Sequence, residues 1–393
     1  MTALPVARPE DVGLSSAALN RLSAALKDRV AAGHVPGAVA LVARHGKIAY
    51  HEAFGAQGPA SDAPMTRESI FRIYSMTKAI VSVAVMMLWE EGRLLLSDPI
   101  GKYIPELGSV QVGVVADGAL KTVPAHRAIT VQDLLRHTSG LTYEFRGTTP
   151  VHKAYIDARV ARLKQTNAEH VALLGALPLL HQPGAHWEYS RSTDVLGRLV
   201  EVMSGQSLGT FLATRILGPL GMTDSGFTVP EKDHGRIAEP FAKDPEGGTD
   251  VALLDVKRTA IFESGGGGMV ATAIDYARFT AMLLNNGRLG DVRLLGRKTV
   301  ELMTSDHLGN VPSNPDLLPP GHGFGLGFAV RTSAGMAPFP GSVGNYYWSG
   351  AAGTSFWVDP TERLCAVLMI QAPAQREHYR LLFRDLVYAA VTD

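Results

Sequence analysis

Residues 75–89 read Ser-Met-Thr-Lys-Ala-Ile-Val-Ser-Val-Ala-Val-Met-Met-Leu-Trp, and this segment organises our interpretation of the chain. After its fourth residue the segment is apolar on nearly all sides, so a helix there would be buried. Gly92 is a suitable residue to end that helix. The apolar run is too short to cross a bilayer. We therefore expect a buried central helix whose start carries the polar pair Ser75 and Lys78.

Ser75 and Lys78 have the spacing of a nucleophile and its base. Side chains three residues apart are neighbours on one face of a helix. A serine hydroxyl is a weak nucleophile at neutral pH and needs an adjacent base, which a neutral lysine can provide. Free N–H groups at a helix start also favour negative charge that develops there. The alternative is a capping serine beside a solvated lysine, so the context has to decide.

Composition limits the classes of protein that this chain can belong to. It has 393 residues, 46% of them hydrophobic, with 37 Lys and Arg against 37 Asp and Glu. The length exceeds that of a usual single domain and supports a sizeable core. Balanced charge gives no attraction to nucleic acid or to an anionic membrane, so we expect neither as a partner. The stretch from Met1 to Glu10 lacks the pattern of a signal peptide, so we expect a cytoplasmic location. The single cysteine, Cys365, lies in an apolar run and is expected to be a buried structural residue.

Strand patterns lie at both ends of the chain, with helical patterns between them. Ser15 and Ser16 precede a predicted helix that ends near Gly33. Strands are predicted over 37–43, 48–53, 323–330, 355–359 and 363–371, and helices over 131–136, 193–203 and 377–391. Such an order suggests one sheet built from both termini. The predicted division is an α/β domain of residues 1–85 and 230–393 and a mainly helical region of residues 86–229.

Five motifs then occur in one order along the chain. They are Ser75-Met-Thr-Lys78, Leu134-Leu-Arg-His-Thr-Ser-Gly-Leu141, Trp187-Glu-Tyr-Ser-Arg-Ser-Thr-Asp-Val-Leu-Gly197, Gly265-Gly-Gly-Gly-Met269 and Trp348-Ser-Gly-Ala351. In these motifs the chain resembles the serine β-lactamase and penicillin-binding-protein superfamily, and most closely the family VIII carboxylesterases, over nearly its whole length. The resemblance implies an α/β, β-lactamase-like fold. Such a fold has a central antiparallel sheet flanked by helices and an inserted mainly helical region.

The resemblance also implies roles for individual residues. Ser75 would be the nucleophile, Lys78 the base and Tyr189 a proton relay, with the backbone amides of Ser75 and Ala351 as the oxyanion hole. An ordinary lysine, with a pKa near 10.4, is almost entirely charged at neutral pH. Either the pKa of Lys78 is strongly perturbed, or Tyr189 does part of the work as a phenolate, and both alternatives stay open.

Two departures from the superfamily pattern bear on the substrate. Arg191 stands where β-lactamases have the asparagine that holds a substrate amide. Trp348, Ser349 and Gly350 replace Lys-Thr-Gly, so the cation that pairs with a substrate carboxylate gives way to an aromatic wall. Gly350 lets backbone approach closely. We expect these four residues to bind substrate and to favour short, neutral acyl esters.

Several other motifs and residues in the sequence are not expected to be catalytic. Gly205-Gln-Ser207-Leu-Gly209 matches G-x-S-x-G, but that motif needs a strand before the serine, and residues 195–203 have helical periodicity. We therefore expect Ser207 to cap a helix. Glycines 265–268 are expected to form a tight turn beside the pocket, and His137 and His322 to be structural. No cluster of His, Cys, Asp or Glu has metal-ligand spacing, so we expect no metal and no other cofactor.

The sequence thus predicts a serine carboxylesterase that acts on a small-molecule ester. A β-lactamase, a D-amino-acid peptidase or an acyltransferase on the same scaffold are the enzymatic alternatives. A penicillin-binding sensor or scaffold that is acylated without turnover is the alternative from another class. The oligomeric state stays open.

Overall fold

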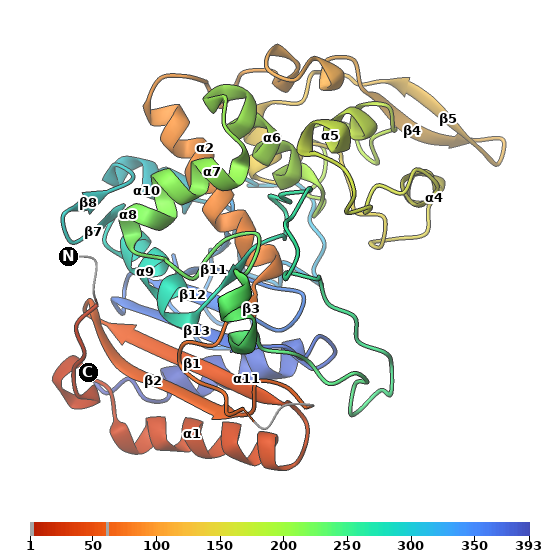
Figure 1. Cartoon of the computed structure of the whole chain (residues 1–393). Helices are drawn as coiled ribbons and strands as arrows, with labels where there is room; N and C mark the ends of the chain where they lie inside the picture. Colours follow the sequence, from red (N-terminus) through yellow and green to blue (C-terminus); the bar gives the residue numbers. More distant parts are fainter. Residues whose placement is uncertain (1–3, 60–62) are drawn as a thin grey trace.

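A seven-stranded antiparallel sheet forms one half of the molecule, and its strands come from both ends of the chain (Figure 1). The computed structural model describes residues 4–59 and 63–393. Residues 1–3 and 60–62 lie outside the described residues, and the first three belong to the stretch Met1 to Glu10 that lacks a signal-peptide pattern. Across the sheet the order is β2 (Lys47–Gly55), β1 (Gly37–Arg44), β13 (Leu364–Ile370), β12 (Ser355–Asp359), β11 (Tyr346–Ser349), β10 (Ala329–Arg331) and β9 (His322–Phe324). Strand β1 pairs with β13, with Ala38 opposite Ile370. The predicted antiparallel sheet is confirmed.

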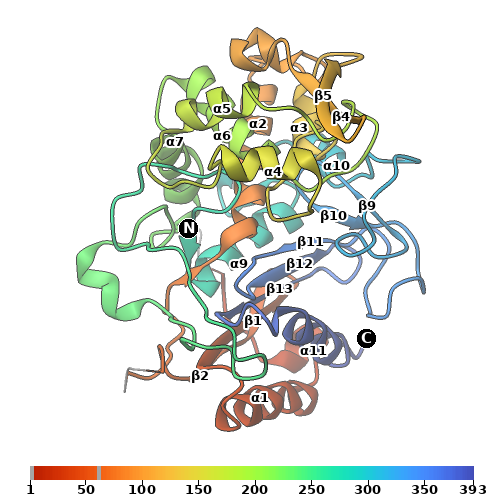
Figure 2. The same cartoon turned by 90° about the vertical axis from the view of Figure 1, so that its right-hand side faces the viewer.

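Helices cover both faces of this sheet. Every residue of β1 is buried, and alternate side chains serve two separate apolar clusters. Val39 and Leu41 face the side of α2 (Thr77–Glu90) and α9 (Ala273–Leu284). Ala40 and Val42 face α1 (Ser16–Ala31) and α11 (Arg376–Tyr388), which lie side by side below the sheet in Figure 2. A strand buried on both faces explains the continuous apolar run in the sequence.

The first and last helices follow the predicted pattern. The Ser15 hydroxyl accepts a hydrogen bond from the amide of Ala18 and so caps α1. Leu19, Leu22 and Leu26 of α1 are buried, as their spacing predicts. Helix α11 begins at Arg376 and packs beside α1. These two helices cover the face of the sheet opposite to α2, and the first turns of α11 also reach the cavity in front of Ser75.

A mainly helical part lies on the other side of α2, as both views show (Figures 1 and 2). Its helices are α3 (Val131–Leu135), α4 (Pro150–Asp157), α5 (Asn167–Gly175), α6 (Ser192–Ser204), α7 (Leu208–Leu212) and α8 (Gly218–Leu220). Helix α2 is buried almost throughout, packs against α6, and ends just before Gly92, whose φ is 70°. It crosses the predicted domain boundary between residues 85 and 86, so the division into 1–85 with 230–393 and 86–229 stays a prediction.

One local prediction was wrong, and one element was not predicted. Residues 323–330 do not form one strand: β9 and β10 are a short hairpin, because the backbone turns at Gly327 with a φ of 103°. An added Cβ at Gly327 would lie 2.4 Å from the hydroxyl of Ser82, so the turn presses against α2. The helical region also contains a hairpin, β4 (Gln111–Ala116) and β5 (Ala119–Pro124), which the sequence analysis did not predict.

The remaining elements are short. They are β3 (Phe71–Arg72), β6 (Val270–Ala271), β7 (Arg288–Leu289), β8 (Val292–Arg293) and α10 (Arg297–Met303). Strands β3 and β6 pair just before the Ser75 turn and just after the glycine-rich segment, which brings these two segments together. Among the residues that the structure describes, no helix is long and apolar enough to span a membrane.

Candidate active site

Ser75 lies in a tight turn that leads into α2. Residues Tyr74–Met76 form one turn of 3-10 helix, and α2 itself begins at Thr77. Tyr74 adopts a φ of 43°, a left-handed conformation that is uncommon for a residue with a side chain. Its hydroxyl accepts a hydrogen bond from the amide of Leu254 at 2.9 Å, which ties the strained residue to a neighbouring loop. The turn presents Ser75 to a large cavity.

Lys78 is buried beside Ser75 and is surrounded by oxygen atoms. Its Nζ donates to the Ser75 Oγ at 3.3 Å, to the Tyr143 Oη at 2.9 Å and to the Gly266 carbonyl at 2.5 Å. Its Nζ also lies 4.5 Å from the centre of the Tyr189 ring. Three acceptors match the three protons of an ammonium group.

The surroundings of Lys78 favour its charged form. Burial acts to lower the pKa of Lys78, but the phenol oxygens of Tyr143 and Tyr189 outweigh burial and raise the pKa above its ordinary value. Burial in turn raises the pKa of Tyr143 to about 12, although the Lys78 charge acts to lower it. With its proton in place, Lys78 cannot accept the proton of Ser75. Burial therefore does not make Lys78 the neutral base that the first alternative requires, and the second alternative, in which Tyr189 does part of the work as a phenolate, stays a prediction.

Two groups near Lys78 were missed by the sequence analysis. Tyr143 contacts Lys78 directly, and it follows the predicted motif 134–141 by only two residues, which was the one available signal. The Gly266 carbonyl comes from the glycine-rich turn, which lines the cavity as predicted. The side chain of Asp194 holds that turn by accepting from the Ser264 hydroxyl at 2.5 Å and from the Gly266 amide at 2.9 Å.

Tyr189 and Trp348 form a hydrogen-bonded pair. The indole Nε1 of Trp348 donates to the Tyr189 Oη at 3.1 Å, and the two ring centres are 5.1 Å apart. Both residues are buried, with exposed fractions of 8% for Tyr189 and 5% for Trp348. Trp348 thus lines the cavity and also holds the phenol oxygen of Tyr189 in position.

Arg191 lines the cavity but is already paired. Its guanidinium donates to Glu144 at 2.7 Å and lies 3.6 Å from Asp194. It also stacks over the Tyr143 ring, 4.7 Å from the ring centre. Two carboxylate partners leave little of its charge for a substrate, so the predicted binding role of Arg191 gains no support from this geometry.

The backbone amides of Ser75 and Ala351 are the two donors predicted to form the oxyanion hole. Within residues 4–59 and 63–393, neither amide donates to a protein acceptor. Both residues line the cavity. Gly350 allows the end of β11 to come this close to the Ser75 turn, because an added Cβ would lie 2.2 Å from the Thr354 Oγ1 and 2.4 Å from the Ile73 carbonyl. This is the arrangement expected of an oxyanion hole.

The cavity in front of Ser75 has a volume of about 870 Å³ and a largely apolar lining. Such a volume lies in the range of sites that enclose drug-sized molecules. It is lined by Ser349 and Gly350 as well as by aromatic and aliphatic side chains, among them Phe145, Leu163, Phe262, Leu317, Phe339 and Leu381. The cavity therefore brings together the predicted residues Ser75, Tyr189, Arg191, Trp348, Ser349, Gly350 and Ala351. Their catalytic and binding roles stay predictions.

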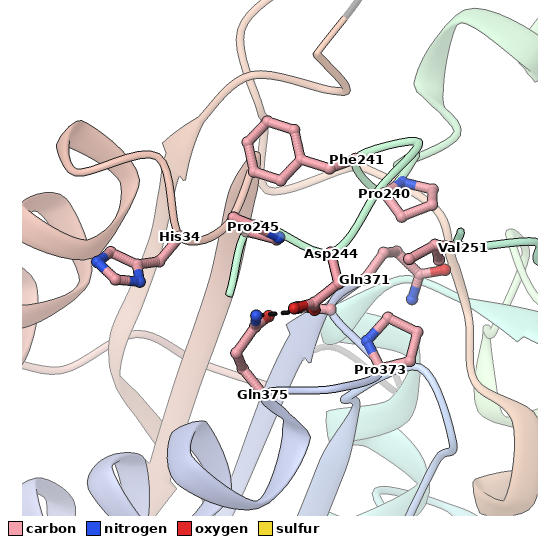
Figure 3. Close-up of a pocket in the computed structure, with 10 residues that line it drawn as sticks. His34, Pro240, Phe241, Asp244, Pro245, Val251, Gln371, Pro373 and Gln375 are labelled. Carbon is pink, nitrogen blue, oxygen red and sulfur yellow. Dashed lines mark hydrogen bonds between the residues drawn. The ribbon is translucent and has the colours of Figure 1, made fainter. Parts of the chain in front are cut away.

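A second hollow, between the loop 240–251 and the start of α11, is far smaller (Figure 3). Its volume of about 10 Å³ is close to the minimum for one water molecule. Gln375 donates to Asp244 across it at 2.8 Å. This hydrogen bond therefore holds the loop 240–251 against the start of α11.

The residues that the sequence analysis set aside have structural positions. Ser207 caps α7, which follows α6 after the left-handed Gly205. The prediction that Ser207 caps a helix is therefore confirmed. His137 is buried against the rings of Trp187 and Tyr189, and burial together with the Lys78 charge holds its pKa well below the ordinary value. Cys365 is buried in β13. In the described part of the chain, no three His, Cys, Asp or Glu side chains gather in a way that would hold a metal ion.

Comparison with known proteins finds the same likeness over nearly the whole chain. A family model described as Beta-lactamase matches residues 22–389. Esterase EstB from Burkholderia gladioli is 31% identical to this chain, over 97% of this chain and 98% of EstB. Protein Rv1367c from Mycobacterium tuberculosis (strain ATCC 25618 / H37Rv) is 38% identical over 88% of each chain. The solved structure of EstCE1, described as a hydrolase with promiscuous acyltransferase activity, is 28% identical with a TM-score of 0.78, over 94% of this chain and 98% of EstCE1.

Proposed function

Since this chain belongs to the β-lactamase family, and within that superfamily to the family VIII esterases, we propose that it is a carboxylic ester hydrolase that works through an acyl-enzyme on Ser75. The observation that carries this proposal is the 3.3 Å contact between the Ser75 Oγ and the Lys78 Nζ at the edge of a cavity with two free amides. The esterase relatives EstB and EstCE1 support the same reaction class.

The first half of the reaction transfers the acyl group to Ser75. The Ser75 Oγ attacks the ester carbonyl while its proton passes to a tyrosine oxygen, for which we propose Tyr189 in its phenolate form. The ammonium group of Lys78 offsets the negative charge during this step. The amides of Ser75 and Ala351 bind the oxygen that becomes negative. Tyr189 then returns the proton to the departing alcohol, and the C–O bond of the ester breaks.

The second half of the reaction hydrolyses the acyl-enzyme. A water molecule gives its proton to the Tyr189 oxygen as it attacks the acyl carbon, and the same proton goes to the Ser75 Oγ when the acid leaves. Each half of the cycle thus restores Tyr189 and Lys78 to their starting forms. Residues that act in this way as a unit give non-additive losses when they are replaced.

We propose short, neutral acyl groups as the preferred substrates. Trp348 stands in place of a lysine that would bind a substrate carboxylate, and the guanidinium of Arg191 is engaged by Glu144 and Asp194. Losing a buried charge-assisted hydrogen bond costs about 1.5–3 kcal/mol, so carboxylate-bearing substrates should be weaker by roughly 10- to 150-fold. The cavity of about 870 Å³ leaves room for a bulky alcohol group beside a short acyl group.

An acyltransferase is the second candidate, and the cavity volume favours it. The same volume could hold an acceptor alcohol beside the acyl-enzyme, in place of water. EstCE1 is described as having promiscuous acyltransferase activity alongside hydrolysis. Adding an alcohol such as butanol to the ester assay and measuring the transfer product by gas chromatography distinguishes transfer from hydrolysis.

The cytoplasmic location also stays a prediction, which cell fractionation would test.

A substrate panel tests the proposed function. We expect p-nitrophenyl butyrate to be hydrolysed with a much higher kcat/KM than nitrocefin or benzylpenicillin. Ser75→Ala should abolish ester hydrolysis, while the matched Ser207→Ala variant should retain most of it. A penicillin that is turned over as well as the butyrate ester would favour a β-lactamase. Stable acylation without turnover of any of the three would favour a sensor or scaffold, and activity lost in Ser207→Ala alone would move the nucleophile.

A further inference from the structure

Arg380 of α11 reaches across to the peptide that we expect to stabilise the oxyanion. Its Nη2 donates to the carbonyl of Gly350 at 2.6 Å, and the amide of Gly353 donates to the same oxygen at 3.0 Å. That carbonyl belongs to the peptide group that also contains the amide of Ala351. The geometry points to Arg380 as a positioning residue that orients and polarises the Ala351 amide of the oxyanion hole. This inference rests on the proposed acyl-enzyme reaction.

The planarity of the peptide links the two ends of this group. In a trans peptide the C=O and N–H bonds point in opposite directions, so a carbonyl that is held on one side directs the amide to the other. Ala351 lines the cavity, and its amide has no acceptor among the described residues. Two donors on the Gly350 oxygen therefore fix the direction in which the Ala351 amide points. A preoriented donor stabilises the transition state without reorganisation at the moment of reaction.

The charge of Arg380 adds a second effect. Its side chain is 17% exposed, whereas that of its carboxylate partner Glu377 is 67% exposed and largely in water. A largely buried cation on the carbonyl polarises the peptide and makes its N–H a stronger donor, because hydrogen bonds in a chain strengthen one another. Burial lowers the pKa of Arg380 to about 10, which still leaves it charged at neutral pH.

The other expected oxyanion donor does not depend on Arg380. The Ser75 amide is positioned by the 3-10 turn at Tyr74–Met76, which belongs to the start of α2. Loss of Arg380 should therefore weaken one donor and leave the other in place. Removal of one such donor typically lowers kcat by 10²–10³, so a donor that is present but poorly oriented should cost less, about 10- to 100-fold.

The test compares Arg380→Gln, Arg380→Lys and wild type, with Arg44→Gln as a matched control. Arg44 is an arginine with a 5% exposed side chain that donates to the backbone carbonyls of Val12 and Gly13, but it lies outside the cavity. We would measure kcat and KM for p-nitrophenyl butyrate, the melting temperature, and the Ki of an aryl trifluoromethyl ketone. Such a ketone forms a tetrahedral adduct with the nucleophile and so reports on the oxyanion hole.

We expect Arg380→Gln to lower kcat about 10- to 100-fold with KM within about threefold of wild type, and to raise the Ki of the ketone by a similar factor. Arg380→Lys should restore part of both losses. Arg44→Gln should lower the melting temperature and leave kcat and the Ki unchanged below that temperature.

Three results would overturn the inference. One is an unchanged kcat and Ki in Arg380→Gln, and another is a rise in KM alone, which would indicate that Arg380 binds the substrate directly. The third is a loss of kcat with an unchanged Ki. If wild type binds the ketone but hydrolyses no ester, the proposed function fails, while a weaker Ki in Arg380→Gln would still support the role of Arg380.

Discussion

Replacing Trp348 with phenylalanine would remove one hydrogen bond from the catalytic centre and keep an aromatic ring in place. The lost bond is the one from the indole Nε1 to the Tyr189 oxygen, at 3.1 Å in a buried environment. Leaving a buried polar atom without its partner costs about 1–3 kcal/mol. If Tyr189 transfers protons in the transition state, the same loss appears in the barrier, so kcat should fall about 5- to 150-fold.

Trp187→Phe is the matched control. Trp187 is also a fully buried tryptophan that lies against the Tyr189 ring, with ring centres 6.3 Å apart. Among the described residues its indole nitrogen has no hydrogen-bond partner. The two variants therefore lose a similar ring volume next to Tyr189, but only Trp348→Phe loses a hydrogen bond to it. We expect kcat of Trp187→Phe to stay within about threefold of wild type, since no polar partner is lost.

The measurement is kcat and KM for p-nitrophenyl butyrate at 25 °C, with melting temperatures to check that each variant is folded. A double variant, Trp348→Phe with Tyr189→Phe, should be no slower than Tyr189→Phe alone, because the hydrogen bond acts only through the phenol. Equal losses in Trp348→Phe and Trp187→Phe would show that packing around Tyr189 matters and the hydrogen bond does not. Additive losses in the double variant would refute the role of Trp348 as a positioning group for Tyr189.

Three further predictions concern the catalytic residues Lys78 and Tyr189, Gly350 beside the proposed oxyanion hole, and the pH dependence of stability. Lys78→Ala, Tyr189→Phe and the double variant should each lose at least about 10² in kcat, with the double little worse than the worse single variant; near-native kcat of Tyr189→Phe would contradict the relay. Gly350→Ala should abolish ester hydrolysis, measured with p-nitrophenyl butyrate, because its Cβ would lie 2.2 Å from a threonine hydroxyl. Although burial acts to raise it, the hydrogen bond from Arg127 helps to lower the pKa of Asp133 to about 2. That folded value lies below the unfolded value near 3.9, so the ionised carboxylate stabilises the fold above about pH 4, and this stability is lost as the pH falls through 2. Between pH 5 and pH 2, the free energy of unfolding, measured with urea, should fall by about 2 kcal/mol less in Asp133→Asn than in wild type.

Much of the fold could be predicted because the chain obeys simple periodicities. The apolar run of β1 and the leucine spacing of α1 each identified their element, and a capping serine marked the start of α1. The hairpin β4–β5 was missed although its signal is present. Asp117 and Gly118 form its turn, both with positive φ, between two valine-containing runs, and Asp-Gly in that position favours a tight hairpin.

The candidate site was predictable only in part, for a different reason. Motifs identify residues that are close in sequence, such as Ser75 and Lys78, but not the groups that tertiary packing adds. The carbonyl of Gly266 has no side-chain signature, and a hydrogen bond from Arg380 to Gly350 joins residues 30 positions apart. The direction of the pKa shift at Lys78 also depends on Tyr143, whose contact with Lys78 exists only in the folded chain.

The pairing of β1 with β13 has a consequence for synthesis on the ribosome. Strand β1 is among the first parts of the chain to emerge, but its partner across Ala38 is Ile370, roughly 330 residues later. At typical elongation rates of about 5–20 residues per second, β1 waits roughly 15 to 70 seconds for that partner. During this interval its apolar residues and one row of its backbone groups lack their native neighbours, which is the condition under which strands join other chains. Chaperone capacity and translation rate should therefore influence the yield of this protein in a host cell.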